Sequence, residues 1–122
     1  MIGIDLFAGG GGLTLGAKLS GIDVRAAVEN HPSACLTYQT NHPGTLMVNS
    51  DIAKVHTIDV GKRDQPLVLF GGPPCQGFST SNQRTRHAEN PKNWLFQEFL
   101  RMVRMLRPDW VVFENVAGIL LT

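Results

Sequence analysis

The stretch that decides the fold lies at the start of the chain, where residues 2–12 read IGIDLFAGGGG. Residues 2–7 form a short, mostly apolar run, which favours a buried strand, and four consecutive glycines follow soon after it. Residues 13–20 favour a helix, and Gly21 is well placed to end it. A strand, a glycine loop and a helix in this order let a ligand approach the backbone closely and face a helix N-terminus.

The rest of the chain repeats this alternation of apolar strands and helices. Further strands are predicted at residues 24–28, 46–48, 67–70 and 110–113, with helices at residues 32–40 and 95–106. Continuous apolar strands that alternate with helices predict a parallel sheet covered on both faces. We therefore expect an α/β, Rossmann-like fold with about five parallel strands, in a single domain over residues 1–122.

Composition and charge restrict the class of protein. With 122 residues, 43% hydrophobic and 17% charged, the chain can bury one core and is typical of a soluble globular protein. Asp5 interrupts the first apolar stretch and no basic residue precedes it, so we expect no signal peptide, no membrane partner and a cytoplasmic location. The net charge is +1, with an excess of arginine after Pro66 that fits either phosphate contacts or an ordinary solvated surface.

The chemically distinctive residues all follow predicted strands. Ligands of open α/β sheets bind at the carboxyl ends of the strands, so these residues are expected along one rim of the sheet. In chain order they are Phe7 to Gly12, Glu29, Asp51, Pro73 to Cys75, and Glu114 with Asn115. This convergence predicts a binding site at that rim.

The glycine loop does not match either common phosphate-binding motif. Thr14 stands where a G-x-G-x-x-G motif that starts at Gly9 needs its last glycine, and no Gly-Lys-Ser/Thr occurs. Glu29, about 20 residues further on, is placed where an acidic side chain binds ribose hydroxyls. A ligand with a ribose but no pyrophosphate, such as S-adenosylmethionine, fits, with Asp51 near its adenine amino group. The alternative is a purely structural turn.

The two cysteines receive different interpretations. Cys35 lies inside a predicted amphipathic helix and is expected to be a small buried apolar residue. Cys75 follows Pro73-Pro74 beyond a strand and is the candidate nucleophile. Glu114 should arrive at the same rim partly desolvated, which would raise its pKa and let it act as an acid, although a Glu paired with Arg is the alternative. Neither cysteine has C-x-x-C spacing, so no zinc site is expected.

Two basic segments remain ambiguous from sequence. Residues 77–93 are predicted as a long loop whose Ser79, Ser81 and basic residues could close on nucleic acid, or be an ordinary surface loop. Arg101, Arg104 and Arg107 recur every three residues on the last helix and are expected to form a solvated face.

Three motifs together resemble those of the DNA (cytosine-5) methyltransferases. They are DLFAGGGG at residues 5–12, GPPCQGFS at residues 72–79 and ENV at residues 114–116. The resemblance implies that Cys75 adds to C6 of a flipped-out cytosine and that Glu114 protonates or hydrogen-bonds N3. It implies that S-adenosylmethionine is bound by Phe7, Ala8, Gly9, Gly10, Gly11, Gly12, Glu29, Asn30, Asp51, Ile52, Pro74 and Leu95. Gln76, Ser79, Ser81 and Asn115 would contact the DNA substrate.

The chain also departs from that family pattern. Family members continue beyond the fifth strand with further strands, a target-recognition region and a late helix against the cofactor pocket. Residues 110–113 would then be a bare apolar edge. We therefore expect a fragment, or one half of a split enzyme that works with a complementary C-terminal methyltransferase chain, as in DNA methylation by restriction-modification systems. The alternatives are an RNA cytosine-5 methyltransferase and a non-catalytic S-adenosylmethionine-binding remnant.

Overall fold

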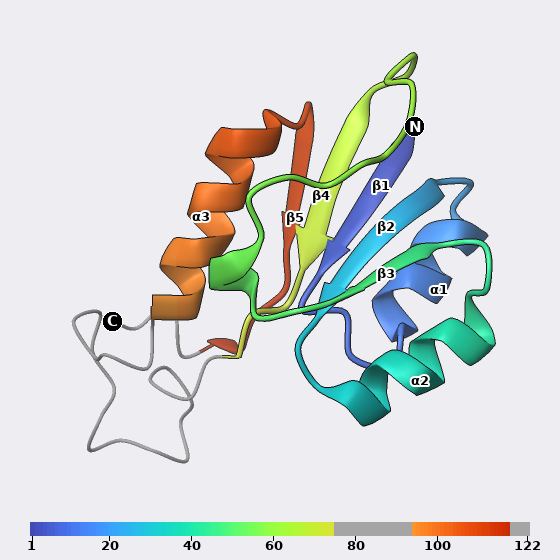
Figure 1. The fold of residues 1–122 in the computed structure, drawn as a ribbon. Coiled ribbons are helices and arrows are strands. Elements are labelled where there is room, and N and C mark those ends of the chain that lie inside the picture. The colour runs from blue at the N-terminus through green and yellow to red at the C-terminus, as the bar shows by residue number, and fades with distance from the viewer. Residues whose placement is uncertain (75–93, 118–122) are drawn as a thin grey trace.

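The computed structural model describes residues 1–74 and 94–117, which form one five-stranded sheet with helices on both faces (Figure 1). The strands are β1 (Ile2–Leu6), β2 (Asp23–Glu29), β3 (Leu46–Asn49), β4 (Leu67–Gly71) and β5 (Trp110–Phe113). They lie in the order β3-β2-β1-β4-β5, and every neighbouring pair is parallel. The predicted α/β fold with five parallel strands is confirmed, and each strand end lies within one residue of its predicted position.

The helices cover the sheet in two layers, visible on its two sides in Figure 1. Helices α1 (Gly12–Leu19) and α2 (Pro32–Asn41) pack beside β1, β2 and β3. On the other face, α3 (Trp94–Leu106) packs beside the short 3-10 helix η1 (Ile52–Lys54). Each crossover therefore returns the chain to the same end of the sheet, which brings the carboxyl ends of all five strands together.

Side chains along β1 point alternately to the two faces of the sheet and so contribute to the packing on both. Ile2, Ile4 and Leu6 are fully buried and join Phe99 and Met102 of α3 in the larger apolar cluster. Asp5 points to the other face, toward α1, and is 1% exposed. Because β1 is the central strand and is buried on both faces, it is the rigid support of the loop that follows it.

Arg101 fastens the η1 side of the sheet to α3. Its guanidinium donates hydrogen bonds to the carbonyl oxygens of Ile52 (2.7 Å) and Val55 (2.9 Å) and pairs with Glu98 one turn earlier. The sequence-based expectation that Arg101 belongs to a solvated face is therefore wrong. The helical period places all three arginines toward solvent, but the carbonyls of η1 lie next to Arg101 only in the folded chain.

Strand β5 forms one edge of the sheet. Trp110, Val111 and Val112 are 63%, 45% and 53% exposed, and within residues 1–74 and 94–117 no strand pairs with the free side of β5. The predicted apolar edge is thus present in the described part of the chain. In the same part, no helix has both the length and the apolar character that crossing a bilayer requires.

Candidate active site

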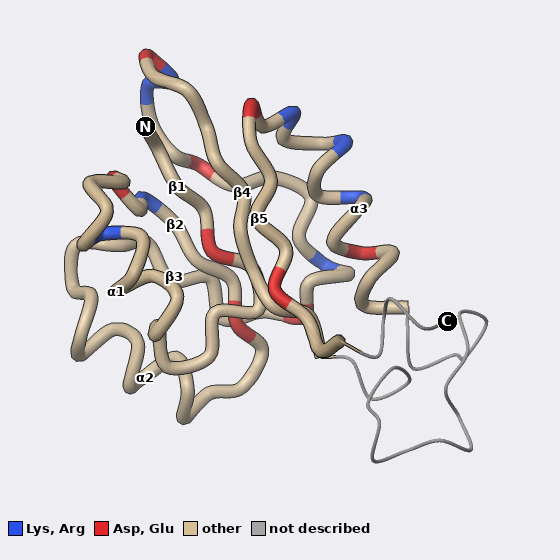
Figure 2. The backbone as a smooth tube through the Cα atoms, turned by 180° about the vertical axis from the view of Figure 1, so that it is seen from behind, with Lys and Arg blue, Asp and Glu red and all other residues tan. Residues whose placement is uncertain are grey.

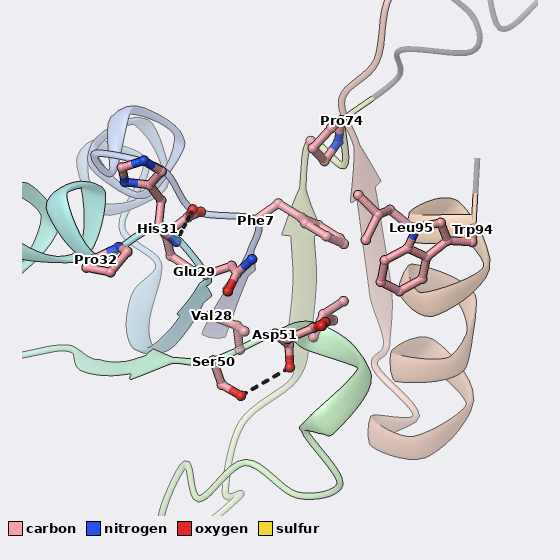
Figure 3. A pocket seen from close by; sticks show the side chains of 13 residues that line it. Phe7, Val28, Glu29, His31, Pro32, Ser50, Asp51, Pro74, Trp94 and Leu95 are labelled. Atoms are coloured by element: carbon pink, nitrogen blue, oxygen red, sulfur yellow. Dashed lines mark hydrogen bonds between the residues drawn. The ribbon is translucent and has the colours of Figure 1, made fainter. Parts of the chain in front are cut away.

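A pocket of about 670 Å³ lies at the carboxyl ends of the strands (Figure 3). Its volume is in the range that binds small molecules and cofactors. Residues from the ends of β1, β2, β3 and β4 and from the first turn of α3 line it: Phe7, Val28, Glu29, Asn30, His31, Pro32, Ser50, Asp51, Ile52, Gly72, Pro74, Trp94 and Leu95. The predicted rim therefore contains a cavity, with carboxylates on two adjacent strands and apolar side chains facing them.

The structure brings most of the predicted cofactor residues into this pocket. Seven line it: Phe7, Glu29, Asn30, Asp51, Ile52, Pro74 and Leu95. The other five, Ala8, Gly9, Gly10, Gly11 and Gly12, lie outside the lining, and Ala8 is 8% exposed. The glycine loop is linked to the pocket through Glu29, a lining residue whose carboxylate accepts a hydrogen bond from the Gly9 amide.

Phe7 adopts a strained backbone conformation at the end of β1. Its φ is +58°, in the left-handed region that a bulky side chain rarely enters. Figure 3 shows the ring directed across the pocket toward Leu95. Such strain persists only where the surroundings over-determine it, and it is concentrated at functional sites.

Glu29 joins two loops at the centre of the rim. One carboxylate oxygen accepts a hydrogen bond from the Gly9 amide (2.9 Å) and the other accepts one from the His31 amide (3.1 Å). A carboxylate oxygen has a second acceptor direction, so Glu29 can still accept from ligand hydroxyl groups. Its first effect is to hold the glycine loop against the start of α2.

A buried polar network supports the glycine loop from below. Asp5 accepts a hydrogen bond from the Thr14 hydroxyl (2.7 Å), which also hydrogen-bonds the Tyr38 hydroxyl (2.8 Å). Next to Tyr38, the His42 ring meets the Gly11 carbonyl through Nε2 (3.0 Å) and Lys18 through Nδ1 (3.2 Å). Because the Lys18 ammonium can only donate, we assign the proton of the neutral ring to Nε2, which donates to Gly11.

Gly11 is required by this packing. Its φ is +94°, and a Cβ atom there would lie 2.6 Å from the His42 ring and 2.8 Å from the Tyr38 ring. The sequence analysis attributed the glycines to close approach by a ligand. At Gly11 the close approach is made by two side chains of α2 and its C-terminal cap.

Asp5 is a titratable group with no direct access to the pocket. Burial raises its pKa to about 7, against the opposing effect of the Thr14 hydrogen bonds. Its Oδ1 atom is buried and has no hydrogen-bond partner in the described part of the chain. Both features fit a carboxyl group that keeps its proton in the folded chain well above the ordinary pKa of an aspartate. No sequence signal marked this group beyond a polar residue within an apolar strand.

Asp51 caps η1 and faces the pocket from the end of β3. Its Oδ1 accepts a hydrogen bond from the Ala53 amide (2.9 Å). Its second oxygen is left as an acceptor toward the cavity that Asp51 lines. Ile52, 4% exposed, adds an apolar surface beside it.

Glu114 lies against the pocket wall at the end of β5. Its amide donates to the Gly71 carbonyl (2.9 Å), and its Oε2 would lie 2.5 Å from a Cβ atom built on Gly72. The expected partial burial of Glu114 is wrong, because the residue is exposed in the structure. Burial depends on what packs over an edge strand, which a single strand's sequence does not reveal. Asn115 accepts a hydrogen bond from the Val116 amide through Oδ1 (2.8 Å).

Several predicted residues lie outside the described residues. They are Cys75, Gln76, Ser79 and Ser81, together with the rest of the predicted loop at residues 77–93. The chain enters this segment from Pro74, which lines the pocket.

The prediction that Cys35 is a small buried apolar residue is confirmed. It is 3% exposed, its thiol donates to the Glu29 carbonyl, and burial raises the pKa of that thiol.

Charge is unevenly distributed over the described chain. Figure 2 shows acidic residues near the carboxyl ends of β1, β2 and β5, and the basic residues of α3 away from that rim. Among residues 1–74 and 94–117, no arginine or lysine suited to phosphate contacts lines the pocket, and its carboxylates are Glu29 and Asp51. This polarity suits a cationic or hydrogen-bond-donating ligand.

Sequence reasoning missed several lining residues. His31, Pro32, Ser50 and Trp94 all border the pocket. His31 and Ser50 directly follow or precede the predicted site residues Asn30 and Asp51, so adjacency was an available signal for these two, whereas Pro32 lies one residue further on. Trp94 precedes Leu95 at the start of α3.

Comparison with known proteins identifies the family. The model of the C-5 cytosine-specific DNA methylase family matches residues 1–122, the whole chain. The chain belongs to this family. The recognition made from the three sequence motifs is confirmed.

Curated relatives of this DNA methylase family member are named Type II methyltransferases. M.XorII of Xanthomonas oryzae is 40% identical over 97% of this chain, which spans 28% of that relative. M.AquIA of Picosynechococcus is 38% identical over 96% of the chain and 49% of the relative. M.HgiGI of Herpetosiphon aurantiacus is 40% identical over 93% of the chain and 88% of the relative. The chain thus spans between about a quarter and half of the length of the first two.

Solved structures share the fold. A prophage-encoded E. coli protein, described as a DNA modification methyltransferase, aligns over 98% of this chain with a TM-score of 0.78 and 39% identity. The match covers 33% of that structure. The Dnmt2 methyltransferase of S. pombe aligns with a TM-score of 0.67 at 22% identity and shares the fold alone.

Proposed function

We propose that this chain forms the cofactor pocket and supplies the catalytic residues of a DNA (cytosine-5-)-methyltransferase. The observation that carries the proposal is the pocket at the carboxyl ends of the strands, where Phe7, Glu29 and Asp51 meet Leu95. Pro74 in its wall leads directly to Cys75. Family membership supports cytosine as the base on which Cys75 would act.

The pocket fits S-adenosylmethionine in polarity and size. Glu29 retains acceptor capacity for ribose hydroxyls, and Asp51 for an adenine amino group. Ile52, Leu95 and Phe7 offer apolar surface to the purine. Ala8 and Gly9 to Gly12 would act through the loop that the Gly9 amide ties to Glu29. The bound cofactor would supply an electrophilic methyl group on its sulfonium sulfur.

Cys75 and Glu114 would act on a cytosine extruded from the duplex. The Cys75 thiolate adds to C6 while Glu114 hydrogen-bonds or protonates N3, so the ring's charge is neutralised and C5 becomes nucleophilic. C5 would take the methyl group as its bond to the sulfonium sulfur breaks, which leaves S-adenosylhomocysteine. Loss of the C5 proton to water would then re-form the C5–C6 double bond as the C6–Sγ bond breaks, releasing the Cys75 thiolate and 5-methylcytosine. Gln76, Ser79, Ser81 and Asn115 would hold the base. The exposed Glu114 carboxyl would lose water when the base enters.

We propose that residues 1–122 are a partial methyltransferase catalytic domain whose target-recognition region is supplied elsewhere. The chain spans 28% of M.XorII and 49% of M.AquIA, which supports a complementary segment in the same polypeptide or in a partner chain. DNA is the proposed substrate, and a restriction-modification system is the proposed context, because the relatives are named Type II methyltransferases.

The decisive experiment is methyl transfer from labelled S-adenosylmethionine to duplex DNA by this chain mixed with a complementary C-terminal methyltransferase chain. We expect 5-methylcytosine in the mixture and little from the chain alone. Cys75→Ser should abolish transfer, whereas Cys35→Ala, the matched control, should retain it. If Cys75→Ser leaves activity intact, the assignment of the nucleophile is wrong.

The same assay distinguishes the proposed function from the two alternative functions. Transfer to RNA and not to duplex DNA would indicate an RNA cytosine-5 methyltransferase. Cofactor binding without transfer to either nucleic acid, in the presence of the complementary chain, would indicate a non-catalytic cofactor-binding protein.

A further inference from the structure

Trp94 is an aromatic residue in the pocket wall to which no role has yet been assigned. It is the first residue of α3, it is 43% exposed, and it borders the cavity together with Leu95. Figure 3 shows its indole on the α3 side of the pocket, across from Asp51. A large aromatic ring that is half covered beside a cavity gains free energy from a ligand that covers the rest.

The surroundings of Trp94 hold it in a defined place. Leu95, its neighbour, packs against the main apolar cluster that also contains Phe99 and Ile52. Arg101 ties the same helix to the Ile52 and Val55 carbonyls of η1. The wall that carries Asp51 and the wall that carries Trp94 are therefore fixed relative to one another.

The two sides of the pocket differ in polarity. The β2 side presents Glu29, Asn30 and His31, which offer hydrogen-bonding groups. The α3 side presents Leu95 and the indole of Trp94, with Ile52 next to them. A nucleoside satisfies both sides when its ribose lies at Glu29 and its purine lies between η1 and α3.

We propose that Trp94 is a further cofactor-binding residue, which contacts the purine ring of the bound cofactor and shields it from water. The inference rests on the proposed function, because it takes S-adenosylmethionine to be the occupant of this pocket. Asp51 recognises the edge of the purine, and Trp94 covers part of its surface. Stacking of this kind tolerates changes at the sulfur end of the ligand, since the indole contacts only the base.

The chain offers a direct optical test, because it contains two tryptophans, Trp94 and Trp110. Trp110 pairs with Val68, whereas Phe113 pairs with Gly71 beside the pocket, so Trp110 lies about 10 Å away along the strand. In Trp110→Phe, all indole emission comes from Trp94. We expect S-adenosylhomocysteine and adenosine to change that emission, and homocysteine to leave it unchanged. In Trp94→Phe, emission from Trp110 should not respond.

Affinity provides the second measurement. Equilibrium dialysis with labelled S-adenosylmethionine should show roughly 10-fold weaker binding for Trp94→Ala, and binding within about threefold of the parent for Trp94→Phe, which keeps an aromatic ring. Circular dichroism should show unchanged secondary structure in both variants. If the substitutions acted by disrupting the fold, both variants would bind the cofactor more weakly, including Trp94→Phe.

The outcomes separate this inference from the function on which it rests. If labelled cofactor binds the parent chain but Trp94 emission is unchanged at saturation and Trp94→Ala binds normally, Trp94 is not a cofactor contact and the proposed function stands. If no cofactor binds at millimolar concentration, either to the parent chain or to its mixture with the complementary C-terminal chain, both the pocket assignment and the role of Trp94 are overturned.

Discussion

Gly72 lies between the pocket and the side chain of Glu114. It lines the cavity, and a Cβ atom at this position would lie 2.5 Å from Oε2 of Glu114. The conflicting atom is the end of a flexible side chain, so the fold can accommodate a methyl group by moving the carboxylate. The position of that carboxylate is what the proposed chemistry requires.

Gly72→Ala should therefore impair catalysis more than stability. We expect methyl transfer, measured with the complementary chain, to fall by at least roughly tenfold because the acid at N3 is displaced. The free energy of unfolding should change by less than about 1 kcal/mol. Gly44→Ala is the control, since a Cβ atom there meets nothing within 4 Å. Unimpaired transfer by Gly72→Ala would argue against a catalytic Glu114.

The raised pKa of Asp5 makes stability depend on pH. Its pKa is 3.8 in the unfolded chain and about 7 in the folded chain, because burial disfavours the charged form. Between these values the folded chain holds a proton that the unfolded chain has released, so stability falls as pH rises through this window and then levels off. The total loss is on the order of 4 kcal/mol.

Asp5→Asn cannot ionise and should lack this loss. Urea unfolding at several pH values should show that the free energy of unfolding of the variant rises relative to that of the parent chain from pH 4 to pH 7. Above pH 7 the difference should stay constant. Asp109→Asn is a control of opposite sign, because the Leu67 amide and then Arg63 hold the pKa of Asp109 below its usual value. Asp109→Asn should be less stable than the parent chain at neutral pH, and this deficit should shrink as pH falls from the ordinary aspartate pKa toward the lowered one. A difference between Asp5→Asn and the parent that is independent of pH would show that Asp5 is ionised throughout.

At the scale of elements, η1 and α3 act as one unit. Arg101 supplies the hydrogen bonds between them, and both carry residues of the pocket. The pocket wall is therefore stabilised by a side chain that does not touch the cavity. Such a residue positions the site without binding the ligand.

Arg101→Ala should weaken both the fold and cofactor binding. Loss of its hydrogen bonds to two η1 carbonyls should cost about 1–2 kcal/mol in unfolding free energy and several-fold in cofactor affinity by dialysis. Arg104→Ala, an exposed position on the same helix, should change stability by less than about 0.5 kcal/mol. Equal effects of the two substitutions would show that the general charge of α3, and not the Arg101 contact, matters.

At the scale of the whole molecule, β5 is an edge strand of the sheet formed by the described residues, and its apolar side chains are exposed. Val112 is 53% exposed and Trp110 is 63% exposed on this strand. Apolar strand edges pair with other chains. We expect the chain to self-associate with rising concentration, as measured by sedimentation.

Val112→Lys should shift the sedimentation profile toward the monomer, because a lysine on an edge strand opposes pairing. Leu19→Lys is the control: Leu19 is 81% exposed but lies at the end of α1, away from that edge. A similar shift in both variants would attribute association to scattered apolar surface and not to β5.

Local sequence patterns predicted which residues belong to the site. Parallel pairing of the strands predicted that these residues would meet at one edge of the sheet. Glu29 and Asp51 were predictable because each ends an apolar run, and parallel strands end at the same side. Glu114 was placed correctly at the rim but not in its exposure. Arg101 was misassigned because the carbonyls it binds are about 50 residues earlier in the chain.

The sequence alone determined the strands, the helices and the motif residues. These features depend on residues close together in the chain, because they follow from the periodicity of apolar residues and from the turn residues between them. The tertiary structure decided the strand order β3-β2-β1-β4-β5, and with it which side chains share a wall. It also decided that Gly11 packs against Tyr38 and His42, that Asp5 is buried, and that Trp94 borders the pocket at the carboxyl ends of the strands. These features depend on contacts between distant segments, because burial and desolvation are set by whatever the fold brings alongside.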